Sequence, residues 1–206
     1  MKTVIVVGSH RPKSESARVA EVLKRHLTRI TGTHGSIDTI DLGQSPLPLW
    51  DEEMWSDAPS KWGQLWSPLS DKLKAADSFI VISPEYAGMA AATLKNFFLF
   101  ATSGQLAHKP GLIVSVSSGT GGAYPVAELR MSSYKNSHLC YIPEQLIVRK
   151  VNDLFHSEEP ASWGPEETLL RKRFDFSLNQ LLHYSRALKQ MRESPSFQWT
   201  EFPYGM

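Results

Sequence analysis

The sequence predicts a three-layer α/β sandwich built on a parallel sheet. Short apolar runs alternate with amphipathic helical patterns along the chain, as expected when each strand is followed by a crossover helix and the next parallel strand. No change of composition, internal repeat or low-complexity segment interrupts this alternation. A chain of 206 residues also suits a single core. We therefore expect one domain over residues 1–192, followed by a C-terminal tail over residues 193–206.

Five apolar runs predict the strands. The first begins almost at the N-terminus and ends before Gly8 and Ser9, which start a turn. The second precedes a long connection rich in proline and tryptophan, and the third ends before Pro84, which cannot donate to a sheet ladder. The expected strands cover residues 3–7, 36–42, 78–83, 111–117 and 139–148.

Five helical patterns follow these strands. The first has a stripe that includes Leu23 and Leu27, and the last has the clearest periodicity, with Leu170 and Phe174 near a start at Pro165. The expected helices cover residues 14–30, 65–76, 90–101, 122–135 and 165–188. Five such units with right-handed crossovers suit the flavodoxin-like strand order 2-1-3-4-5, which is the order we predict.

Composition excludes several classes of partner. Twenty-two Lys and Arg residues against 21 Asp and Glu residues leave a formal charge of +1, so no strong field attracts nucleic acid or an anionic membrane. The single cysteine, Cys140, excludes an internal disulfide framework and favours the reducing cytoplasm. No apolar run approaches the roughly 20 residues that a membrane-spanning helix needs. We expect a cytoplasmic protein that binds neither nucleic acid nor membrane.

A ligand site is expected where the strands end, because ligands of such sheets bind beyond the carboxyl ends at the switch point of the strand order. The loop after the first strand, residues 8–16, holds Arg11, three serines and the start of a helix. Free helix amides, hydroxyls and a guanidinium suit a phosphate monoester. Simple helix capping by Ser14 or Ser16 is the alternative. The GxxxxGK[ST] and GxGxxG signatures are both absent.

Two further loops reach the same edge. Residues 83–89 contain Pro84 and Gly88, which free backbone groups to meet the polar edge of a flat heterocycle, and Tyr86 adds a ring face. Residues 115–122 contain three glycines in four positions, which permit close approach of a ligand to the backbone. Ordinary turns are the alternative for both loops.

No metal site or acid–base centre is expected. The seven histidines form no pair four residues apart and have no neighbouring acidic set. His10 differs only in lying within the first loop, where it could approach a phosphate or simply face water. No Ser/His/Asp or Cys/His constellation is present either, so the sequence offers no dedicated catalytic residue.

Two aromatic segments also carry predictions. After the second strand come Trp50, Trp55, Trp62 and Trp66. We expect at least two of them in the core, although aromatic groups also suit subunit contacts. The C-terminal tail carries Phe197, Trp199, Phe202 and Tyr204. We expect this tail to pack on its own domain or on a neighbouring subunit.

Together, the loops resemble the NADPH-dependent FMN reductase family, whose members include quinone, azo-dye and chromate reductases. The resemblance covers roughly residues 3–151 and, more loosely, the last helix. Its parts are Gly8-Ser9 with Arg11, Ser14 and Ser16; Pro46-Leu47-Pro48-Leu49 with Asp51-Glu52; Pro84-Glu85-Tyr86 with Leu94-Lys95-Asn96; and Gly121-Gly122 with Leu129-Arg130. There are two departures: Ala87 stands where the family usually has Asn, and the spacing Gly119-Thr120-Gly121-Gly122 is one residue short.

The resemblance implies the cofactor and the site. The FMN phosphate would be held by Ser9, Arg11, Ser14 and Ser16, with Ala17 beside them. The isoalloxazine would be lined by Pro84, Glu85, Tyr86 and Ala87 on one side and by Ser115, Ser117, Ser118, Gly119 and Gly121 on the other.

The resemblance also implies an activity. NADPH or NADH would pass a hydride to FMN, which would reduce a quinone, a flavin or a similar acceptor. A homodimer or homotetramer is implied as well. The alternatives are a non-enzymatic electron carrier of flavodoxin type, against which the charge of +1 argues, and a scaffold without flavin.

Overall fold

The computed structural model describes residues 1–56 and 61–201. The side chain of Trp55 and the tail residues Phe202 and Tyr204 lie outside the described part.

The sheet has the predicted parallel order. Its main strands are β1 (Lys2–Val7), β2 (Ser36–Asp41), β3 (Ser78–Tyr86), β5 (Pro110–Val116) and β6 (Cys140–Val148). They lie in the order β2-β1-β3-β5-β6 with every neighbouring pair parallel, which confirms 2-1-3-4-5 for the five predicted strands. The sequence analysis missed a short sixth strand, β4 (Met89–Ala90), which pairs antiparallel with the end of β3.

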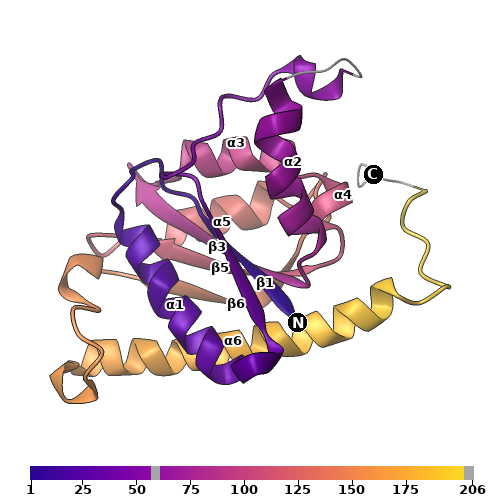
Figure 1. Cartoon of the computed structure of the whole chain (residues 1–206). Coiled ribbons are helices and arrows are strands. Elements are labelled where there is room, and N and C mark those ends of the chain that lie inside the picture. The colour runs from indigo at the N-terminus through magenta and orange to yellow at the C-terminus, as the bar shows by residue number, and fades with distance from the viewer. Residues whose placement is uncertain (57–60, 202–206) are drawn as a thin grey trace.

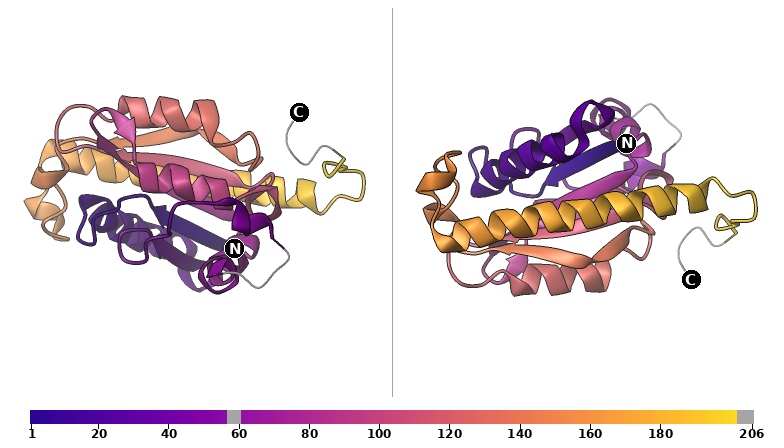
Figure 2. Two further views of the ribbon diagram at one scale, coloured as in Figure 1. Left: turned by 90° about the horizontal axis from the view of Figure 1, so that it is seen from above. Right: turned by 90° about the horizontal axis from the view of Figure 1, so that it is seen from below.

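Helices cover both faces of this sheet. They are α1 (Glu15–Thr31), α2 (Lys61–Lys74), α3 (Ala92–Phe100), α4 (Ser103–Leu106), α5 (Ala123–Ser132) and α6 (Pro165–Arg192). Helices α1 and α6 pack on one face, and α2, α3 and α5 pack on the other (Figures 1 and 2). The one-turn helix α4 was not predicted, since four residues show no periodicity.

Each face has its own apolar core. Alternate β1 residues enter opposite layers, so that Ile5 packs with α1 and α6 whereas Val6 packs with α2 and α3. Trp62 and Trp66 of α2 are 2% and 5% exposed and lie against the ring of Phe100, with centroids 4.8 and 5.4 Å away. These contacts confirm the expectation that at least two of the tryptophans lie in the core.

The turn between β3 and β4 places a residue with a side chain in the left-handed region. Ala87 and Gly88 have φ of 50° and 75° between the paired residues Tyr86 and Met89. Positive φ at both central positions is typical of a type I′ hairpin, which favours Asn-Gly or Gly-Gly.

Replacing Ala87 by glycine is therefore expected to raise the free energy of unfolding by about 0.5–1 kcal/mol, because the left-handed conformation costs an L-residue roughly 1–2 kcal/mol. The matched control is Ala127→Gly in α5, which should lower stability by about 1 kcal/mol. Urea unfolding measures both, and a loss of stability in Ala87→Gly would contradict a strained turn.

The described part of the C-terminal tail folds back onto its own domain. The ring of Phe197 meets His108 edge-on at 4.9 Å, and Trp199 packs near His108 and His138 at 5.3 and 5.8 Å. Nε2 of His108 is buried and has no hydrogen-bond partner in the described chain. Burial, together with the neighbouring His138 and Arg192, lowers the pKa of His108.

This arrangement predicts a pH-dependent tail contact. The pKa of His108 is about 6.5 in the unfolded chain and lower in the folded chain. As the pH falls below about 6.5, His108 therefore takes up a proton in the unfolded chain first. The stability that this group contributes is lost as the pH falls through the lowered pKa of the folded state. The measurement is the difference in Tm between the full chain and a chain ending at Ser194. We expect this difference to be smaller at pH 5 than at pH 7.5. A difference independent of pH would contradict the coupling.

Candidate functional site

Four loops surround a cavity of about 390 Å³ at the carboxyl edge of the sheet. Three are the segments predicted as loops at the carboxyl ends of β1, β3 and β5, and the fourth follows β6. The predicted end of the third strand at residue 83 is wrong, because β3 continues through Pro84 to Tyr86 by pairing with β5 and β4. The cavity is lined by Arg11, Lys13, Ser14, Glu15, Ser16, Pro84, Glu85, Tyr86, Val116, Ser118, Val151 and Asn152. The predicted edge of the sheet therefore contains a cavity to which all three predicted loops contribute.

The first loop presents unpaired donors. Oγ of Ser14 accepts a hydrogen bond from the amide of Ala17 at 3.1 Å, so Ser14 caps α1 as the simpler interpretation proposed. The amides of Glu15 and Ser16, in contrast, have no acceptor among the described residues. Arg11 and Lys13 are exposed and form no ion pair within the described chain. This combination of free amides and free cations suits an anion.

Ser9 does not line the cavity but forms hydrogen bonds to two residues that do, Tyr86 and Arg11. It is fully buried, its Oγ lies 2.9 Å from the hydroxyl of Tyr86, and it accepts the amide of Arg11 at 3.1 Å. The preceding residue, Gly8, lies close to the backbone of β3, because a Cβ on residue 8 would be only 2.7 Å from the carbonyl oxygen of Ile82. Ser9 thus joins the first loop to the second.

The second and third loops are joined by Glu85. Its Oε2 accepts hydrogen bonds from the amide of Gly122 at 2.8 Å and from Oγ of Ser117 at 3.1 Å. Gly122 has φ of 96°, a conformation that favours glycine. The amides of Ser118, Thr120 and Gly121 have no acceptor in the described chain. Of these three residues with free amides, Ser118 lines the cavity, and Thr120 and Gly121 follow it in the same loop.

The predicted residues divide into two groups. Those that line the cavity are Arg11, Ser14, Ser16, Pro84, Glu85, Tyr86 and Ser118. Those that lie outside the lining are Ser9, Ala17, Ala87, Ser115, Ser117, Gly119 and Gly121. Ser9 and Ser117 still form hydrogen bonds to lining residues. Ser115 is fully buried, and its hydroxyl has no partner among the described residues.

The sequence analysis missed the fourth loop. Val151 and Asn152 line the cavity and follow the carboxyl end of β6. Arg18 of α1 holds this loop by donating to the carbonyl oxygens of Val151, at 2.6 Å, and Leu154. The rule that ligands bind beyond the carboxyl ends of parallel strands also applies to this loop and could have predicted it. Residues 149–154, however, contain no glycine cluster that distinguishes them from an ordinary connection.

Two residues of the Leu-Lys-Asn run have structural roles. Asn96 donates to the carbonyl oxygen of Pro48 at 2.8 Å and accepts the amide of Trp50 at 2.9 Å, and so fixes the proline-rich segment. Lys95 forms an ion pair with Glu128, which lowers the pKa of that carboxyl group, and Glu128 accepts the amide of Ala90 at 2.7 Å. These contacts hold the β4 turn and helix α3 beside the cavity.

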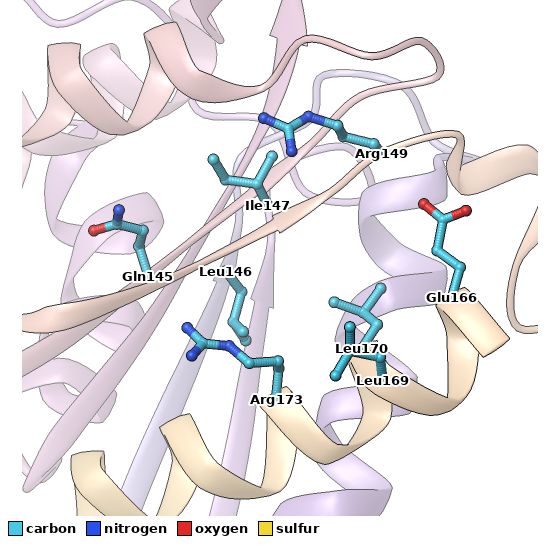
Figure 3. Close-up of a pocket in the computed structure, with 8 residues that line it drawn as sticks. All are labelled: Gln145, Leu146, Ile147, Arg149, Glu166, Leu169, Leu170 and Arg173. Atoms are coloured by element: carbon cyan, nitrogen blue, oxygen red, sulfur yellow. The ribbon is translucent and has the colours of Figure 1, made fainter.

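A second cavity, of about 220 Å³, lies between β6 and α6 (Figure 3). Leu146 and Leu170 form part of its wall, and Arg149 and Arg173 lie at opposite ends of it. Arg173 pairs with Glu144 at 2.8 Å, whereas Arg149 donates to the carbonyl oxygens of Thr120 and Gly121 at 2.7 and 2.8 Å. The two guanidinium groups are thus engaged separately.

Residues 1–56 and 61–201 contain no group of three His, Cys, Asp or Glu side chains that could hold a metal ion. None of the helices within these ranges is long and apolar enough to cross a bilayer.

The strand order and the cavity at its switch point define a flavodoxin-like α/β protein. The chain belongs to the NADPH-dependent FMN reductase family, whose model matches residues 1–153. This match confirms the predicted family and covers all four cavity loops.

Curated relatives agree with this family assignment, and a solved structure agrees with the fold. The chain is 30% identical over 124 residues to a quinone reductase of Pseudomonas putida, a match that covers 58% of this chain and 62% of the relative. It is 27% identical to an FMN-dependent NADPH-azoreductase of Staphylococcus saprophyticus, over 64% of this chain and 68% of the relative. An oxidoreductase from Corynebacterium diphtheriae has the same fold, with a TM-score of 0.71, 15% identity and coverage of 90% and 97%.

Proposed function

We propose that the protein is an FMN-dependent NAD(P)H oxidoreductase, which passes a hydride from NAD(P)H to bound FMN and then reduces a quinone, a flavin or a similar acceptor. The observation that carries this proposal is that free backbone amides lie on two of the loops around one cavity. The amides of Glu15 and Ser16 are free beside Arg11 and Lys13, and Ser118 of the glycine-rich loop, whose amide is also free, lines the same cavity.

This donor set fits FMN. The N-terminus of α1 with Arg11 and Lys13 would hold the phosphate, and the segment Pro84–Tyr86 with the glycine-rich loop would hold the ring. Bound FMN supplies the hydride-accepting centre, so the chain needs no acid or base of its own. The free amides would stabilise negative charge on the reduced ring. The names of the quinone reductase and azoreductase relatives support a small acceptor.

Reconstitution tests this function. We expect the purified protein to take up FMN and turn yellow, to bleach when NADPH or NADH is added without air, and to regain colour with a quinone. Parallel titrations with the two nicotinamides, followed by a panel of acceptors, identify the donor and the acceptor. Slow turnover without a partner reductase would indicate an electron carrier, and failure to bind FMN would contradict the proposal.

We also propose that the protein is a homodimer or homotetramer. Large apolar side chains are exposed on and around α3 and α5, at Met89, Leu99, Tyr124, Met131 and Tyr134. Leu99 and Met131 are 55% and 76% exposed, and burial of such groups stabilises association. Light scattering is expected to give a multiple of the 23.1 kDa chain mass, and the double variant Leu99→Glu, Met131→Glu should have a lower mass. A monomeric wild-type protein would contradict this proposal.

A further inference from the structure

The glycine-rich loop between β5 and α5 is held from two sides by charged groups of opposite sign. On the cavity side, Oε2 of Glu85 accepts the amide of Gly122 at 2.8 Å. On the other side, Nε of Arg149 donates to the carbonyl oxygens of Thr120 and Gly121 at 2.7 and 2.8 Å. The peptide unit between Gly121 and Gly122 is therefore bonded at its oxygen by a cation and at its nitrogen by an anion.

The same contacts explain the glycine at position 121. Its backbone has no positive φ, but a Cβ there would lie 2.0 Å from Oε2 of Glu85. A Cβ at position 121 would therefore displace the carboxylate of Glu85, so glycine at this position preserves the contact with Glu85 rather than meeting a demand of its own conformation. Ser117 extends the contact, because its hydroxyl donates to Glu85 at 3.1 Å and accepts the amide of Gly119 at 3.3 Å.

These bonds leave a defined set of donors. The amides of Gly119 and Gly122 are bonded within the loop network, and those of Ser118, Thr120 and Gly121 are not bonded to any described residue. The carbonyl oxygen of Gly119 is also bonded, by the amide of Lys150 at 2.9 Å. The carbonyl oxygens of residues 119–121 thus accept hydrogen bonds from the protein, whereas three backbone amides of the loop remain free to donate. Free donors of this kind suit the electron-rich edge of a ring.

We propose that Glu85 and Arg149 are positioning residues that clamp the loop over residues 117–122 in its ligand-binding conformation, and that the charge of Glu85 tunes the potential of the bound flavin. The second statement depends on the proposed function. A carboxylate on the cavity wall disfavours additional negative charge in that cavity, and so makes the bound flavin harder to reduce.

Two variants of Glu85 separate its bonds from its charge. Both hydrogen bonds end on the same oxygen, so the amide oxygen of Glu85→Gln can accept both while the charge is removed. This variant is expected to keep loop exchange rates near those of the wild type and to raise the midpoint potential. Glu85→Ala removes the bonds as well, and is expected to speed hydrogen exchange over residues 117–122 and to raise the Kd for FMN at least about tenfold.

Arg149→Ala tests the other side of the clamp. It should also speed exchange in the loop and raise the Kd for FMN, but it removes a positive charge and so should lower the midpoint potential. A loosened loop alone would not shift the midpoint potential in opposite directions in Glu85→Gln and Arg149→Ala. In the double variant Glu85→Ala, Arg149→Ala, the Kd should rise less than the product of the two single effects, since both residues hold one loop.

Matched controls lie elsewhere in the fold. Asp77→Ala removes a carboxylate that accepts the amide of Lys2 at 2.8 Å, at the opposite edge of the sheet. Arg173→Ala removes the other arginine of the β6–α6 cavity. Neither control should change loop exchange or the potential.

Unchanged exchange in Glu85→Ala and Arg149→Ala would overturn the clamp, and an unchanged potential in Glu85→Gln would overturn the tuning. If the wild-type chain takes up no FMN, the proposed function and the tuning both fail, and exchange in the FMN-free protein alone decides whether the clamp exists.

Discussion

Replacing Arg11 and Lys13 together by alanine is expected to raise the Kd for FMN by about a hundredfold, since each charge-assisted contact contributes roughly 1.5–3 kcal/mol and exposure reduces that value. Both side chains line the cavity at the start of α1, and both are exposed without an ion-pair partner in the described chain. The substitutions leave in place the amides at the N-terminus of α1, which are also proposed to contact the phosphate.

Riboflavin distinguishes a phosphate site from a general loss of binding, because it has the same ring system without the phosphate. Its affinity should be nearly equal in the wild type and in the double variant. Two exposed cations outside the cavity, Lys172 and Arg186, supply the matched control of equal charge change. Fluorescence titration measures the affinities of FMN and riboflavin for the wild type, the double variant and the control. An equal loss of FMN and riboflavin affinity would contradict a phosphate site at Arg11 and Lys13.

Replacing Lys109 by methionine is expected to lower the free energy of unfolding by about 3 kcal/mol and Tm by roughly 6–12 °C. Nζ of this buried lysine donates to three carbonyl oxygens, those of Leu73, Lys74 and Gln105, at 2.8–2.9 Å. It therefore joins the end of α2 to α4 and to the start of β5. Methionine fills a similar volume but leaves the three acceptors without their donor.

The charge of Lys109 matters to this prediction. Burial lowers its pKa to about 8, so the ammonium group is still protonated at pH 7 and donates to all three acceptors. Lys74→Met is the matched control, because Lys74 lies at the same helix end but is exposed, and it should change Tm little. Thermal unfolding at pH 7 measures both variants. Equal Tm values for Lys109→Met and the wild type would show that water satisfies these carbonyl groups.

Much of the fold could be predicted because its signals are local. The spacing of Leu170, Phe174 and Leu178 shows which face of α6 is buried. Phe174 and Leu178 lie in the core with α1 and the sheet, and the partly buried Leu170 packs against it. The strand order does not follow from periodicity alone. It was predicted because five successive strand–helix units of this length suit the flavodoxin-like order. The position of the site followed in turn, since a parallel sheet places the ends of β1, β3 and β5 at one edge.

The roles of individual residues were harder to predict. Ser9 and Glu85 were both expected to contact a ligand, yet Ser9 is fully buried against Tyr86, and Oε2 of Glu85 is already bonded to Ser117 and Gly122. The side chain of Ser9 meets a residue 77 positions away, and Glu85 meets residues 32 and 37 positions away. Contacts between residues so far apart in the chain produce no periodic pattern in the sequence, so they could not be predicted from it.

The sequence by itself determined the family, the order of the elements and the edge of the sheet at which the cavity lies, because these depend on periodicity and on motifs of a few consecutive residues. Only the tertiary structure decided that Arg149 supports the glycine-rich loop, that Lys109 joins two helix ends, and that Phe197 and Trp199 cover a pair of histidines. Each of these roles depends on a distance between side chains and backbone groups far apart in the chain, and such distances exist only after the layers have packed.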